Sequence, residues 1–128
     1  VTVGQRASDV AREWFADNRY RDYLYLHGLG VEMAEAMAEY VHTKIRAELG
    51  FAGDDSRDME QLLRQRYRGS RYSFGYPACP TLEDQEPILK LLGAERIGVS
   101  LSDEFQLHPE QSTSAIVVHH SRAKYFSV

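Results

Sequence analysis

The stretch from residue 71 to residue 80 is the part of the sequence best suited to bind a ligand. It reads Arg-Tyr-Ser-Phe-Gly-Tyr-Pro-Ala-Cys-Pro. Gly75 permits a close approach of the backbone to another molecule, and the two prolines stiffen the chain around it. Such a loop can offer backbone N–H and C=O groups, with Tyr76 or Phe74 as a stacking surface and Arg71 as a fork for a carboxylate. The alternative is a rigid connector whose aromatic rings fill the core.

A second candidate group combines carboxylates with an imidazole on one helix. Glu39 and His42 have the Glu-x-x-His spacing of di-iron carboxylate bundles, and Glu35 lies one turn earlier. Such bundles use two of these pairs and further glutamates, whereas this sequence has one pair, so we expect no metal site. Glu35 lies at the margin of the apolar stripe of this helix, which allows a partly buried role. The alternative for Glu35 is an exposed carboxylate near a Lys or Arg.

Cys79 and the His119-His120 pair are weaker candidates. A thiol beside a base can attack a carbonyl, but no base is near Cys79 in the sequence, which favours a buried, inert cysteine. Adjacent residues of a strand point to opposite faces, so the two histidines cannot easily share one metal ion. We expect one of them to be inward and hydrogen-bonded, and the other to be outward.

Composition and charge exclude several classes of protein. The 15 basic residues are outnumbered by 19 acidic ones, which gives a net charge of −4 and argues against a nucleic-acid clamp. Five arginines between residues 57 and 71 suit phosphate or carboxylate, or else form a solvated helix face. No run approaches the roughly 18 apolar residues of a membrane span. One cysteine and no targeting segment favour a reducing, cytoplasmic setting.

The hydrophobic pattern indicates helices first and strands last. Residues 19–25 are either a polar, aromatic connection or a further helical turn, and residues 69–81 are a loop because Gly and Pro are frequent there. Helices are expected at 7–15, 31–49, 58–67 and 83–92, and short strands at 1–4, 96–101, 104–107, 115–119 and 125–128. The longest helix should bury an apolar stripe made of Val31, Ala34, Met37, Ala38, Val41, Ile45 and Leu49. This order predicts an α+β fold in which helices pack on an antiparallel sheet. We interpret residues 1–128 as one domain, and as part of a longer chain because it lacks an initial Met and has strand-like ends.

The loop motif resembles the signature of the C-terminal activation domain of cobalamin-dependent methionine synthase. The resemblance extends to the helix at 33–42, the approach to the loop at 62–69 and the late strands at 112–125, so it covers essentially the whole chain. It implies the C-terminal part of an activation-domain fold that binds S-adenosylmethionine. It also implies docking on a neighbouring cobalamin-binding domain in the cob(II)alamin state, where a flavodoxin-type reductase supplies an electron and S-adenosylmethionine the methyl group.

The resemblance also assigns residues to the ligand. Arg71 matches the arginine that binds the methionine part, Ser73 a backbone contact, and Tyr76 a tyrosine beside the reactive end. The full implied set is Glu35, Arg71, Ser73, Gly75, Tyr76 and Tyr125. The loop reads Tyr72-Ser73-Phe74 where well-known relatives have Pro-Ala-Pro, and the family's further acidic ligand lies upstream of Val1. No catalytic side chain is implied, and the segment is not expected to catalyse alone. A docking domain with an incomplete pocket and a small thiol enzyme using Cys79 are the alternatives.

Overall fold

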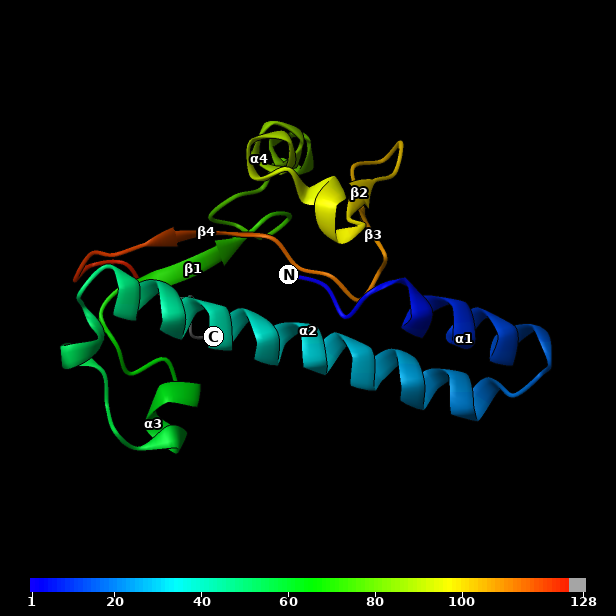
Figure 1. Cartoon of the computed structure of the whole chain (residues 1–128), viewed down its shortest axis with the longest axis horizontal. Helices are drawn as coiled ribbons and strands as arrows, with labels where there is room; N and C mark the ends of the chain where they lie inside the picture. The colour runs from blue at the N-terminus through cyan, green and yellow to red at the C-terminus, as the bar shows by residue number, and fades with distance from the viewer. Residues whose placement is uncertain (125–128) are drawn as a thin grey trace. The chain divides into compact units, whose positions relative to one another are not determined.

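The computed structural model describes residues 1–124 (Figure 1). The chain forms two compact units. Unit 1 consists of residues 1–38 and 81–114, and unit 2 of residues 39–80 and the chain from residue 115. The long helix α2, Tyr20–Glu48, contributes residues to both units. The strand expected at 125–128 lies outside the described residues.

Unit 1 begins with the helix α1, Gln5–Ala16, and the first part of α2. The turn between them is tight because Asn18 adopts a positive φ of 58° and the Arg19 N–H donates to the Trp14 carbonyl at 2.8 Å. Residues 20–25 are helical, so the second option for this segment is the one adopted. The expected strand at 1–4 is reduced to one bridge between Thr2 and Ser112.

The rest of unit 1 is built around a small apolar core. The helix α4, Gln85–Leu92, follows the 3₁₀ turn η2, Leu82–Asp84, and ends at Gly93 in the left-handed conformation that favours glycine. Leu89, Ala94 and Val99 form the core. The strands β2, Ser100–Leu101, and β3, Leu107–His108, pair antiparallel beside it.

Both strands differ from the bounds expected at 96–101 and 104–107. The chain winds into the 3₁₀ turn η3, Ala94–Ile97, because Gly93 and Gly98 both have left-handed dihedrals. The second strand starts later because the Ser102 hydroxyl accepts the N–H groups of Glu104 and Gln106 and closes a turn there.

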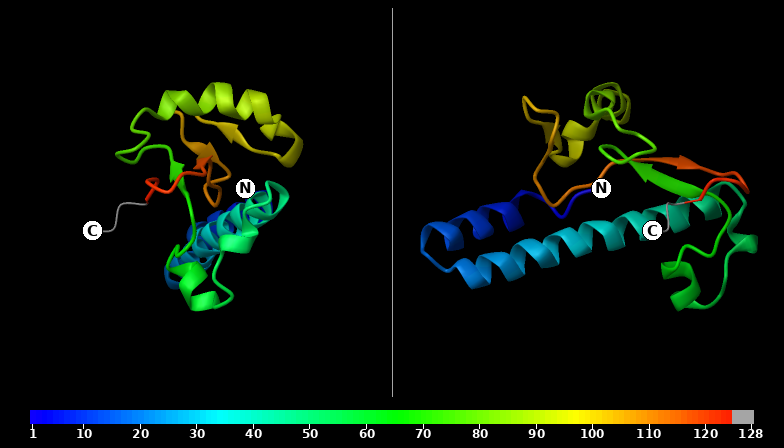
Figure 2. Two further views of the ribbon diagram at one scale, coloured as in Figure 1. Left: turned by 90° about the vertical axis from the view of Figure 1, so that its left-hand side faces the viewer. Right: turned by 180° about the vertical axis from the view of Figure 1, so that it is seen from behind.

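Unit 2 contains an antiparallel pair made of β1, Ser70–Ser73, and β4, Ala115–Val118, which lie side by side in Figure 2. The register places Ser70 opposite Val118 and Ser73 opposite Ala115. The loop expected over 69–81 is therefore wrong at its start, because its Gly and Pro residues leave 70–73 free to form an edge pair. The antiparallel pairs and surrounding helices confirm the α+β class.

Two short helical segments, η1 at Ala52–Asp54 and α3 at Met59–Leu63, connect α2 to β1. The Asp58 side chain caps α3 by accepting the Glu60 N–H. This helix is shorter than the expected 58–67 because Gln65 has a positive φ of 55°. Gly69 then turns the chain into β1 with a φ of 98°.

The buried face of α2 differs from the expected apolar stripe. Ala34 and Ala38 are buried, but Met37, Val41 and Leu49 are exposed. One and two turns after Ala38, the buried residues are His42 and Arg46, each with 2% exposure. The periodicity thus located the second half of the helix, which begins at Tyr20 and not at residue 31. The apolar pattern predicted the wrong buried face, because ionic partners compensate the buried Arg46.

Candidate functional site

The loop after β1 is a turn closed by its own backbone. The Gly75 N–H donates to the Cys79 carbonyl and the Cys79 N–H to the Tyr76 carbonyl, each at 2.8 Å. Gly75 has a φ of 84°, which a residue with a side chain rarely adopts. Phe74 is buried and the Tyr76 ring is 59% exposed, so Phe74 anchors the turn while Tyr76 faces outward.

Cys79 has a structural place in this turn. Its N–H and its carbonyl make the two closing hydrogen bonds, and its side chain is partly buried. The side chain is thus less buried than the sequence analysis expected, since it lies in an exposed turn.

β1 carries the start of the ligand motif. Arg71 lies opposite Val117 and Ser73 opposite Ala115, and both are partly buried. The neighbouring Tyr72 donates its hydroxyl to the Lys124 carbonyl at 3.0 Å. Pairing with β4 therefore fixes the backbone from which the motif side chains extend.

Glu39 holds the guanidinium of Arg71. Arg71 Nη1 donates to Glu39 Oε2, and the two side chains are only 13% and 14% exposed. The Tyr67 hydroxyl donates to the same carboxylate oxygen at 3.0 Å and lies 3.4 Å from Arg71 Nη1. Glu39 and Tyr67 are functional candidates that the sequence analysis did not assign, because the Glu39–His42 spacing placed a carboxylate and an imidazole on one helix but indicated no contact with Arg71.

Arg46 lies beneath this group. Its Nε donates to Asp55 Oδ2 at 2.8 Å, and its Nη2 lies 3.8 Å from Glu39 Oε1. The guanidinium carbon is 3.8 Å from the centre of the Tyr67 ring, which is typical of a cation–π contact. Two arginines, Arg46 and Arg71, are thus balanced by the carboxylates of Glu39 and Asp55.

Burial shifts the pKa of two groups in unit 2. Burial, and then the negative charge of Glu39, raise the pKa of Tyr67 to about 12, so its hydroxyl is a donor at neutral pH. Burial, and then the positive charge of Arg46, lower the pKa of His42 to about 4. The His42 ring contacts the Tyr67 ring edge-on at 5.1 Å and is neutral at pH 7.

Glu35 and Tyr125 are the remaining residues of the implied ligand set. Glu35 is exposed and belongs to the part of α2 in unit 1, whereas Arg71, Ser73, Gly75 and Tyr76 belong to unit 2. Tyr125 lies outside the described residues.

The histidine pair is partly as expected. His119 is inward and stacks on Phe51, with 3.5 Å between ring centres, while His120 is exposed. His119 Nδ1 is buried and has no hydrogen-bond partner within residues 1–124, so the hydrogen bond expected for the inward ring is not made at this atom, and the ring stacks on Phe51. In the same range, no three His, Cys, Asp or Glu side chains are grouped to hold a metal ion.

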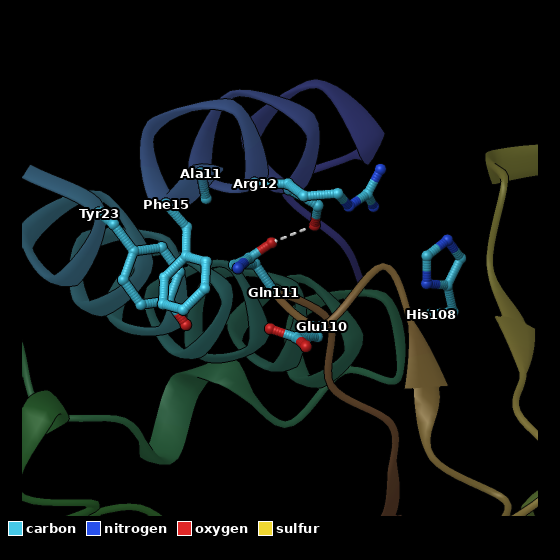
Figure 3. Close-up of a pocket in the computed structure, with 8 residues that line it drawn as sticks. Ala11, Arg12, Phe15, Tyr23, His108, Glu110 and Gln111 are labelled. Carbon is cyan, nitrogen blue, oxygen red and sulfur yellow. Dashed lines mark hydrogen bonds between the residues drawn. The ribbon is translucent and has the colours of Figure 1, made fainter. Parts of the chain in front are cut away.

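A separate pocket of about 270 Å³ lies within unit 1 (Figure 3). The Phe15 and Tyr23 rings lie 5.1 Å apart at one side of it, and Ser8 donates to Gln111 Oε1. Its lining consists of Ser8, Ala11, Arg12, Phe15, Tyr23, His108, Glu110 and Gln111. Among residues 1–124, none of those implied for the ligand lines this pocket, so the loop remains the candidate site.

The length and hydropathy of the described helices decide whether one of them could cross a membrane. Across residues 1–124, none is both long enough and apolar enough to cross a bilayer.

Comparison with known proteins identifies the same family that the loop motif resembles. Residues 1–128 match the family model of the vitamin B12-dependent methionine synthase activation domain. The chain is 55% identical to methionine synthase of Mycobacterium tuberculosis and 53% identical to that of Mycobacterium leprae, in both cases over 134 residues. All of this chain is covered, but only 11% of each relative, so it spans about a tenth of their length.

A solved structure has the same fold. A crystal structure of the MetH reactivation domain bound to AdoHcy is similar with a TM-score of 0.86 and 30% sequence identity. The match covers 94% of this chain and 38% of the solved chain.

Proposed function

The chain belongs to the vitamin B12-dependent methionine synthase activation-domain family, and on this basis we propose that it binds S-adenosylmethionine for reactivation of the enzyme. When bound, S-adenosylmethionine supplies the methyl group for reductive methylation of cob(II)alamin on a neighbouring cobalamin-binding domain, with an electron from a flavodoxin-type reductase. The segment itself binds and orients the methyl donor, and no side chain in it acts as an acid, base or nucleophile. We place this role in the cytoplasm.

The observation that carries the proposal is Arg71, held in a partly buried position at the start of the closed turn. A guanidinium fixed in this way suits the carboxylate of an amino-acid ligand, because charge-assisted hydrogen bonds are strongest where water is limited. The turn has the backbone freedom at Gly75 that a close ligand contact needs. The solved relative bound to AdoHcy, which shares the amino-acid part of S-adenosylmethionine, supports the same class of ligand.

We assign the other residues of the implied set from the resemblance of the loop motif. Ser73 offers backbone groups beside the turn, and Tyr76 offers an exposed ring to the reactive end of the ligand. Glu35 supplies a carboxylate from α2 that suits the ligand's amino or hydroxyl groups, and Tyr125 is a further contact. The protein contribution is therefore positioning, while the ligand carries the reactive methyl group.

Substitution of two residues tests the assignment. In the full-length protein, Arg71→Ala and Glu35→Ala should each weaken S-adenosylmethionine binding by roughly ten- to a hundredfold, because each removes a hydrogen bond to a charged group. Isothermal titration calorimetry measures the affinity, and Arg64→Ala, which removes an exposed arginine paired with Glu60, is the control. Unchanged affinity in both variants would contradict the residue assignment.

A docking role without a ligand is the second candidate. It is favoured by the fact that the chain covers only 38% of the AdoHcy-bound relative. Equilibrium dialysis of the full-length protein with labelled S-adenosylmethionine, compared with S-adenosylhomocysteine and ATP, separates the two functions. Binding of the first two but not ATP supports the ligand role, and binding of none supports docking alone.

A further inference from the structure

Glu39 and Tyr67 lie beside the proposed ligand arginine without belonging to the implied ligand set. We propose that they are positioning residues, which fix the guanidinium of Arg71 in the orientation that receives the carboxylate of the ligand. This inference rests on the proposed function, since it assigns a role to Arg71 in ligand binding.

The contacts form a closed triangle. Glu39 Oε2 accepts from Arg71 Nη1 and from the Tyr67 hydroxyl, and the hydroxyl is 3.4 Å from Arg71 Nη1. The three residues come from three places in the chain: α2, the segment after α3, and β1. Arg71 is therefore oriented by side chains whose backbones are independent of its own strand.

The burial of Tyr67 restricts the orientation of the Glu39 carboxylate and therefore that of Arg71. Tyr67 is 4% exposed, and its ring is held on one side by the Arg46 guanidinium and at its edge by His42. A phenol fixed in this way can hold Glu39 at only one place. Arg46 Nη2, 3.8 Å from the second oxygen Oε1 of Glu39, limits the rotation of the carboxylate.

Orientation before binding has a clear benefit for the ligand. A long arginine side chain loses many rotamers when it is ordered, and affinity falls when binding has to impose that order. Glu39 and Tyr67 order the Arg71 side chain before the ligand binds, through their contacts with Nη1. The chemistry that this arrangement recognises is the carboxylate of an α-amino acid linked to a nucleoside.

The experiment compares a ligand that has this carboxylate with one that lacks the amino-acid part to which the carboxylate belongs. S-adenosylmethionine has it, whereas 5′-methylthioadenosine lacks the amino-acid part. In the full-length protein, Tyr67→Phe should weaken S-adenosylmethionine binding about three- to tenfold, because Glu39 loses one donor but keeps its ion pair with Arg71, and Glu39→Gln about tenfold or more, because Arg71 loses a charged partner. Binding of 5′-methylthioadenosine should change less than about twofold. Tyr40→Phe, at a 62% exposed neighbour on α2, is the matched control.

A double-mutant cycle completes the test. If Tyr67 acts through Arg71, adding Tyr67→Phe to Arg71→Ala should cause no further loss of S-adenosylmethionine affinity. A loss for Arg71→Ala with none for Tyr67→Phe and Glu39→Gln would overturn the positioning role and leave the proposed function standing. Equal losses for both ligands would show a merely structural role and overturn it as well. No measurable binding of S-adenosylmethionine to the unaltered protein would overturn both proposals.

Discussion

His42 and Arg46 occupy successive turns of α2 at positions where a core helix ordinarily places leucine or alanine. Arg46 compensates its burial with Asp55, Glu39 and the Tyr67 ring, whereas His42 Nδ1 has no partner within residues 1–124. An imidazole that is buried in this way avoids charge, and this is the physical reason for its low pKa. We therefore expect His42 to dominate the pH dependence of the stability of the domain.

The stability of the domain should fall as the pH drops from about 6.5 to about 4. The pKa of His42 is about 4 when folded, against the ordinary 6.5, so between these values the unfolded chain binds a proton that the folded chain refuses. The contribution of the neutral His42 ring to the free energy of unfolding is on the order of 3 kcal/mol. This contribution is fully present above pH 6.5 and is lost as the pH falls toward 4. Urea unfolding of the complete activation domain at several pH values measures it.

His42→Gln provides the comparison for this pH series. The variant lacks the titrating ring but keeps the neighbouring ion pairs of Arg46. Its free energy of unfolding should therefore decline less steeply between pH 6.5 and 4 than that of the unaltered domain. Identical slopes for the two proteins would show that His42 is not the source.

At the residue scale, the sequence indicates the arginine proposed to bind the ligand but not the partners of this arginine. Arg71 stands in an unusual string whose glycine and prolines indicate a shaped loop. Glu39 and Tyr67 stand 32 and 4 residues before it, in ordinary helical and polar surroundings. Only the fold brings them together, because spacing along the chain carries no information about a contact between α2 and β1.

At the scale of elements, Gly69 determines whether β1 can pair with β4. It has a φ of 98°, and a Cβ at this position would lie 2.5 Å from the Val118 carbonyl oxygen. Gly69→Ala should therefore lower the free energy of unfolding by about 2–3 kcal/mol, from backbone strain together with the clash. Thermal or urea unfolding of the complete domain measures the loss.

Gly50→Ala separates the two causes. Gly50 also has a positive φ, 83°, but nothing lies within 4 Å of an added Cβ. It should cost about 1 kcal/mol, from strain alone. A Gly69→Ala variant no less stable than Gly50→Ala would show that the strand pair can shift to admit the methyl group.

The elements also show where a sequence pattern is informative. Gly93 ends α4 at the expected place because the left-handed conformation favours glycine for local reasons. The strands at 100–101 and 107–108 are two residues each, and turn geometry at Gly98 and Ser102 decides their bounds. Periodicity is uninformative over so short a strand.

At the scale of the whole molecule, exposed apolar side chains on α2 indicate contacts beyond this chain. Leu29, Met33 and Met37 are 58%, 45% and 38% exposed. They follow one another at four-residue spacing, which places them along one side of the helix. Because the chain covers 38% of the solved reactivation domain, we expect the remainder of such a domain to cover these residues.

Met37→Glu tests this expectation. In the complete activation domain it should lower the free energy of unfolding by about 2 kcal/mol or more, because a charge would be buried without a partner. Ala47→Glu, at an exposed position of the same helix, should change it by less than about 0.5 kcal/mol. Equal, small effects on thermal unfolding would mean that Met37 stays in solvent.

The division of the chain into interleaved units has a consequence for its synthesis. Unit 1 needs residues up to 114, and unit 2 needs β4 at 115–118. When synthesis has reached residue 80, the chain contains all of α1, α2 and β1 but neither unit in full. Unit 1 must then wait for residue 114 and unit 2 for β4, so the early helices cannot complete their packing until these late residues have left the ribosome.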